Sequence, residues 1–173
     1  MRREDIEKRA KEILRDHNLL DIPVDPLTIA KALGIKVMNA KFSESDRSGA
    51  IAKRGGITSI FLDSDDSPAR KRFSIAHEIG HYMLHMQTAD DIEIVDKKDN
   101  FRSIPVESSE WTDEKRMEWE ANIFAAALLM DEDLIREEWL KSKDLLKMAW
   151  RFQVSQSAIA IRLTSLGLIN EFE

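Results

Sequence analysis

Three of the four histidines in this chain lie close together, at His77, His81 and His85. The five residues from His77 to His81 read His-Glu-Ile-Gly-His and fit the pattern H-E-x-x-H. Residues four apart lie on one face of an α-helix, one turn from each other, so the two outer imidazoles of this pattern can bind one zinc ion. The spacing therefore predicts a helix whose face carries a metal site.

Other sequence signals place this helix within an α+β fold. Ser67 followed by Pro68 is typical of a helix start and predicts a helix over about residues 68–86. Two short β-prone runs joined by Gly55-Gly56 predict a β-hairpin over residues 48–63. Further helices are expected over 4–18, 26–34 and 113–130, a strand over 35–42, three short helices in 132–173, and irregular structure over 87–111.

We thus expect a small β-sheet packed with helices around the H-E-x-x-H helix, plus a helical, helix-turn-helix-like C-terminal segment. The corresponding division is an N-terminal helical lobe (1–40), a core that resembles a zincin-like metallopeptidase in its H-E-x-x-H helix (41–131) and the C-terminal helical segment (132–173).

Glu78 adds a carboxylate beside the histidine face. It is rotated about 100° from His77 on the helix, where it can take a proton from a water molecule next to the metal. Such a hydrolase site needs three protein ligands and an open position. His85 lies about 12 Å along the helix axis from His77, too far to share one ion with both other histidines. We expect His85 to line the cleft or pack beside it, and Tyr82 to border the site.

The predicted helix over 113–130 offers a carboxylate as third ligand. Glu118 and Asn122 are four apart and share a face, so Glu118 could bind the metal while Asn122 supports a ligand or bridges to the backbone. Glu120 points about 200° away from Glu118, so the two cannot face the same ion. Helix-face geometry favours Glu118, with Glu120 as the alternative.

Composition limits the remaining choices. The chain has no cysteine, so a metal must rely on His, Asp and Glu. The formal net charge is −6, from 26 Lys+Arg and 32 Asp+Glu, whereas a dedicated nucleic-acid binder usually carries a basic excess. No apolar run reaches the roughly 18 residues of a membrane span, and the N-terminus lacks the apolar core of a signal peptide. We expect a cytoplasmic location without membrane attachment.

The C-terminal segment has the apolar spacing of a helix-turn-helix. The turn is expected at residues 153–155, and Ser155 can cap a second helix that runs through Leu166. This would-be recognition helix has a single basic residue, Arg162, which is few for phosphate contacts. We favour a segment that packs on the rest of the chain or docks a partner. Direct DNA binding is the less favoured alternative.

Two stretches together resemble the ImmA/IrrE family of zinc metallopeptidases: "RFSIAHEIGHYMLH" (72–85) and "EWEANIFAAALLM" (118–130). Upstream, "IPVDPLTIAKALGIKV" and "SGAIAKRGG" are similar to the N-terminal lobe and the hairpin of that family. The resemblance covers most of residues 20–131. Ser74 stands where the family has Thr, and Asp131 where it often has Pro; neither position touches the chemistry.

The resemblance implies that His77, His81 and Glu118 bind one zinc ion per chain and that Glu78 is the catalytic base. It also implies an endopeptidase that cleaves or inactivates a partner helix-turn-helix transcriptional repressor, as in stress responses. Two other hypotheses stay open. One is a DNA-binding regulator that uses the C-terminal helices. The other is a toxin–antitoxin-type partner-binding module whose zinc site is structural or latent.

Overall fold

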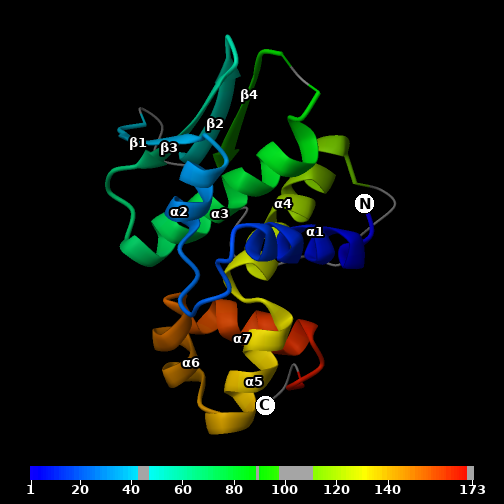
Figure 1. Ribbon diagram of the computed structural model, residues 1–173. Helices are drawn as coiled ribbons and strands as arrows, with labels where there is room; N and C mark the ends of the chain where they lie inside the picture. Colours follow the sequence, from blue (N-terminus) through cyan, green and yellow to red (C-terminus); the bar gives the residue numbers. More distant parts are fainter. Residues whose placement is uncertain (43–46, 89, 98–110, 171–173) are drawn as a thin grey trace.

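The computed structural model describes residues 1–42, 47–88, 90–97 and 111–170. Within these residues, seven helices and a four-stranded mixed sheet confirm the predicted α+β fold class (Figure 1). The division of the chain at residues 40 and 131 stays a prediction. The elements are α1 (Arg3–Asp16), α2 (Pro26–Ala32), β1 (Lys36–Ala40), β2 (Arg47–Arg54), β3 (Ile57–Asp63), α3 (Pro68–His85), β4 (Ile92–Lys97), α4 (Asp113–Leu129), α5 (Glu132–Ser142), α6 (Leu145–Phe152) and α7 (Gln156–Ser165).

The sheet has the strand order β1-β3-β2-β4. β2 pairs antiparallel with both β3 and β4, whereas β1 and β3 are parallel. The predicted hairpin is confirmed: Gly55 and Gly56 both have positive φ at the turn between β2 and β3, a conformation that glycine adopts without steric cost. Ile51 and Ile60 face each other across these two strands and are fully buried in the core. Figure 1 shows α3 running along the sheet.

One strand contradicts the sequence-based expectation. Residues 87–111 were expected to be irregular, but residues 92–97 form β4 at the edge of the sheet. Ile92 and Ile94 pack against the core, while Glu93 and Val95 are exposed, which is the alternation of a half-buried strand. The run is short and polar residues flank it, so its periodicity is a weak signal in the sequence. The rest of the expected irregular stretch, residues 98–110, lies outside the described residues.

Helices α3 and α4 pack closely against each other and form the centre of the molecule. The contact depends on Gly80. A Cβ atom at this position would lie 3.1 Å from the Cα atom of Ala121 and 3.2 Å from the Cβ atom of Phe124. Glycine therefore permits a close approach that a side chain would obstruct. Almost the whole of α4 from Trp119 onward is buried, and the neighbouring helix α1 also packs against it.

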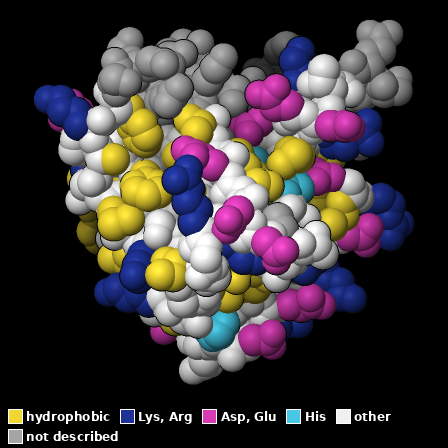
Figure 2. Space-filling model, turned by 90° about the horizontal axis from the view of Figure 1, so that it is seen from above, with side chains coloured by type: hydrophobic (Ala, Val, Ile, Leu, Met, Phe, Trp, Pro, Cys, Tyr) yellow, Lys and Arg dark blue, Asp and Glu magenta, His cyan; other side chains and the backbone are white. Residues whose placement is uncertain are grey.

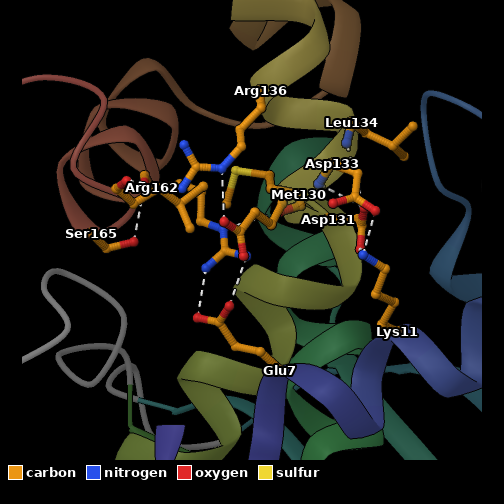
Figure 3. Close-up of polar contacts among 11 residues, drawn as sticks. Glu7, Lys11, Met130, Asp131, Asp133, Leu134, Arg136, Arg162 and Ser165 are labelled. Carbon is orange, nitrogen blue, oxygen red and sulfur yellow. Dashed lines mark hydrogen bonds and ion pairs between the residues drawn. The ribbon is translucent and has the colours of Figure 1, made fainter. Parts of the chain in front are cut away.

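The three expected C-terminal helices are present as α5, α6 and α7. In Figure 1 they lie below α1 and α4, on the side away from the sheet. Arg162 of α7 joins them to the rest of the chain. The residue is only 2% exposed. Its Nε atom donates to the carbonyl oxygen of Met130 at 3.0 Å, and its Nη1 atom donates to Oε1 of Glu7 at 2.8 Å (Figure 3). Among the described residues, no helix is both long and apolar enough to cross a membrane.

Candidate metal centre

Helix α3 carries the histidine pair into the interior. Its start is well determined: Ser67 is the N-cap, its hydroxyl accepts a hydrogen bond from the backbone N–H of Arg70 at 3.4 Å, and Pro68 is the first helical residue. Residues 74–81 are all buried, and the side chains of His77 and His81 are both 0% exposed. The predicted helix and the shared face of these histidines are therefore present.

Three donor groups converge from α3 and α4. The Nε2 atoms of His77 and His81 are 3.0 Å apart. Glu118 places one carboxylate oxygen 3.6 Å from Nε2 of His77 and the other 3.3 Å from Nε2 of His81. One ligand atom from each residue lies within 4.8 Å of the others. Two imidazole nitrogens and one carboxylate oxygen form a donor set that suits a divalent transition metal such as zinc.

Asn122 holds the first histidine from behind. Its Oδ1 atom lies 3.0 Å from Nδ1 of His77, and the contact is buried. With the amide oriented in this way, Nδ1 of His77 carries the proton and donates it to the amide oxygen. The lone pair of Nε2 then points toward Glu118 and His81. This is how an outer partner selects the tautomer that a metal ligand requires.

His81 has a longer chain of supporting contacts. Its Nδ1 atom is 3.2 Å from Nδ1 of His85, and Nε2 of His85 is 2.9 Å from Oε2 of Glu120. If His85 donates from Nε2 to Glu120, its Nδ1 is free to accept the proton of His81. Burial, the largest effect, lowers the pKa of His85 below its ordinary value, although the hydrogen bond with Glu120 acts in the opposite direction. A neutral His85 fits this chain of contacts.

Glu118 and Glu120 take different places, as helix-face geometry predicts. Glu120 is not part of the donor set; it contacts His85 and forms an ion pair with the N-terminal amine. Burial by itself would raise the pKa of Glu120. The hydrogen bonds from the amine and from His85 outweigh burial and hold this pKa below its ordinary value. An ionised Glu120 is therefore suited to orient His85.

Glu78 lies on a different side of α3, facing the sheet. Its side chain is fully buried. A Cβ atom at Gly49 of β2 would lie 2.6 Å from Oε1 of Glu78, so the missing side chain at position 49 leaves the space that this carboxylate occupies. Gly49 could not be predicted as part of the site, because a glycine in a hairpin strand gives no signal of the tertiary neighbour it accommodates. Tyr82 is partly buried and packs against the core next to the site.

The candidate metal centre has little contact with solvent. Figure 2 shows histidine side chains at the surface beside hydrophobic and acidic side chains. His77 and His81 are completely buried, whereas the side chains of His85 and Glu118 are 9% and 15% exposed. The donor groups are therefore largely screened from bulk water.

Comparison with protein families gives one match that spans most of the chain. Residues 30–164 match the model of the IrrE N-terminal-like domain family, Peptidase_M78. This range includes the three donor residues and Glu78, together with helices α5 and α6 and most of α7.

Two individual proteins are also similar. The radiation response metalloprotease IrrE of Deinococcus radiodurans is 33% identical over 109 residues, which is 61% of this chain and 30% of that protein. A solved structure titled Mycobacterium tuberculosis transcriptional regulator aligns with 92% of this chain and 47% of its own length, with a TM-score of 0.61 and 17% identity. The chain thus spans less than half the length of either, and the second likeness concerns the fold alone.

Proposed function

Because the chain belongs to the IrrE N-terminal-like domain family (Peptidase_M78), we propose that it is a zinc-dependent endopeptidase that binds one zinc ion through His77, His81 and Glu118. The observation that carries the proposal is the convergence of these three donor groups within 4.8 Å, with a buried carboxylate, Glu78, on the adjoining face of α3. Three protein ligands leave a position for water and substrate, as a catalytic site requires.

Each side chain has a defined task in this proposal. When bound, zinc would polarise the scissile carbonyl and make water more acidic. Glu78 accepts the proton of the attacking water and returns it to the amine that leaves. Asn122 orients the His77 ring. His85 orients the His81 ring; both nitrogens of His85 already have partners within the chain, which favours positioning over contact with the substrate.

The substrate in this proposal is a helix-turn-helix transcriptional repressor, which the protein cleaves and so inactivates, in the cytoplasm. The support is the family resemblance and the name of the similar Deinococcus protein, a metalloprotease of the radiation response. The test is to incubate the zinc-loaded protein with a helix-turn-helix repressor encoded beside its gene and to measure intact masses. Two fragments that appear with the wild type and not with Glu78→Gln would support the proposal. An intact repressor after prolonged incubation with the zinc-loaded wild type would refute this substrate.

The position of Arg162 disfavours the alternative that the C-terminal helices bind DNA. Arg162 is the single basic side chain of α7, and it is buried and held by Glu7 and the carbonyl oxygen of Met130. It is therefore not available for phosphate contacts while α7 keeps this position. The third hypothesis, a module with a structural or latent zinc site, predicts that Glu78→Gln keeps full biological activity, whereas the peptidase proposal predicts its loss.

A further inference from the structure

A cavity of about 400 Å³ lies where the first half of α3, the second half of α4 and the start of α7 meet. This volume is in the range of ligand-binding pockets. Its apolar wall comes from all three helices and from the turn before α7: Phe73, Ala126, Met130, Val154, Ala158 and Ile161. We propose that the cavity receives an aliphatic or aromatic side chain of the polypeptide substrate, next to the bond that is cleaved. This inference rests on the proposed peptidase function.

Two residues that line the cavity, Phe73 and Asn122, contact the ring of His77. Phe73 lies one helical turn before His77, and the centroids of their rings are 6.4 Å apart. Asn122 lines the cavity and also bonds Nδ1 of His77. On α4, the residues Glu118, Asn122 and Ala126 follow at intervals of four and share one face. These contacts place the cavity at the Nδ1 side of His77, one imidazole ring away from the Nε2 atom that faces Glu118 and His81. We expect a side chain next to the cleaved bond to reach the cavity past the edge of this ring.

Several polar groups that line the cavity already have partners within the chain, which favours an apolar occupant. Arg162 is held by Glu7 and the carbonyl oxygen of Met130, as Figure 3 shows. The Nε atom of Arg70 is 3.5 Å from a carboxylate oxygen of Asp66. The hydroxyl groups of the two lining serines of α7 and its cap, Ser155 and Ser157, lie within hydrogen-bond distance of each other, at 2.9 Å. A charged side chain would lose its hydration on entering the cavity, a cost that an apolar side chain does not have.

The first test measures side-chain preference without catalysis. The zinc-loaded protein is titrated calorimetrically with acetohydroxamate and with amino-acid hydroxamates of alanine, leucine and phenylalanine. We expect the leucine and phenylalanine compounds to bind roughly tenfold or more tightly than the alanine compound, because the larger side chains bury more apolar area. Equal affinity for all three would overturn the inference.

A pair of substitutions on α7, one inside the cavity and one outside it, provides a matched comparison. Ala158→Phe adds a ring to the cavity wall, and Ala160→Phe adds the same ring on α7 at a position that does not line the cavity. We expect Ala158→Phe to abolish the preference while acetohydroxamate still binds, and Ala160→Phe to keep it. A preference that survives in a folded Ala158→Phe protein would overturn the inference. Ala158→Leu serves the same purpose if the larger side chain prevents folding.

A second measurement separates this inference from the proposed function. Protein labelled with ¹³C at alanine methyl groups is titrated, without metal, with N-acetyl-leucinamide and with N-acetyl-alaninamide. We expect the methyl signals of Ala126 and Ala158 to shift with the leucine compound alone. If these methyl signals shift but acetohydroxamate does not bind to the zinc-treated protein, the result supports side-chain binding in the cavity and refutes the zinc site. An absence of shifts would refute the cavity, whatever the metal centre does.

Discussion

The Nδ1 atom of His77 lies 3.0 Å from the Oδ1 atom of Asn122 on the neighbouring helix. This buried contact fixes which nitrogen of His77 faces Glu118 and His81, so it links the packing of α3 and α4 to the donor geometry of the site.

We expect Asn122→Ala to weaken zinc binding about 10- to 100-fold, because the imidazole loses the acceptor that selects its tautomer. Competition with a chromophoric zinc chelator measures this change. Asn39→Ala, at an exposed position of β1, is the matched control and should bind zinc as the wild type does. Wild-type affinity in a folded Asn122→Ala protein would contradict the assigned role.

Glu118 and Glu120, two residues apart on one helix, allow the same substitution to be compared at a proposed metal ligand and at a residue outside the donor set. We expect Glu118→Gln to weaken zinc binding by more than about 100-fold, because it removes a ligand, and Glu120→Gln to weaken it less, because it only loosens the support of His85. Zinc content after dialysis against a weak chelator compares them. The opposite order would make Glu120 the third ligand.

Gly49 should matter for the chemistry and not for metal binding. A methyl group at this position would lie 2.6 Å from Oε1 of Glu78, so Gly49→Ala must displace that carboxylate. We expect normal zinc affinity and a turnover lower by roughly 100-fold, the effect of a displacement of about 1 Å in a catalytic group. Ala52→Ser, on the other face of the same strand, is the control. Unchanged turnover in Gly49→Ala would show that Glu78 has more room than the structure provides.

The contact of Glu7 with Arg162 should make stability depend on pH. Burial alone would raise the pKa of Glu7, but hydrogen bonds and charge from Arg162 and Arg3 outweigh it and hold this pKa below its ordinary value. The contact therefore stabilises the fold fully above the unfolded pKa of about 4.3, and this stabilisation is lost as the pH falls through the folded pKa.

Glu7→Gln should lower the free energy of unfolding by about 1–3 kcal/mol at pH 7 and by less at pH 3. Urea denaturation at both pH values measures this difference. Glu12→Gln, on the same helix but exposed, should change stability by no more than about 0.5 kcal/mol. An effect of Glu7→Gln that is the same at both pH values would contradict the role of the ionised carboxylate.

Features that depend on local sequence could be predicted, and features that depend on tertiary contacts could not. Ser67 and Pro68 predict the start of α3 because capping is a local interaction. The spacing of His77 and His81 predicts their shared face for the same reason. The partner of His85, by contrast, is Glu120, 35 residues away, and Gly49 meets Glu78 across a helix–sheet interface. No local pattern reports such contacts.

In the C-terminal segment, the helices could be predicted from the sequence but their role could not. The apolar spacing of residues 145–166 predicts two helices and a turn, and α6 and α7 confirm them. The same pattern suits a DNA-binding helix and a helix that packs on a core. Only the burial of Arg162 and its bonds to Glu7 and the carbonyl oxygen of Met130 distinguish these readings.

In the proposed function, His77, His81 and Glu118 hold a metal and Glu78 acts with it to hydrolyse peptide bonds. The most direct measurement compares the zinc-loaded wild type with zinc-loaded Glu78→Gln on the proteins of a lysate from its own organism. New N-termini are identified by mass spectrometry, and zinc content is measured in both samples. We predict equal zinc in the two proteins and new N-termini with the wild type alone. The same new termini with Glu78→Gln, or none with the fully loaded wild type, would contradict the proposed peptidase function.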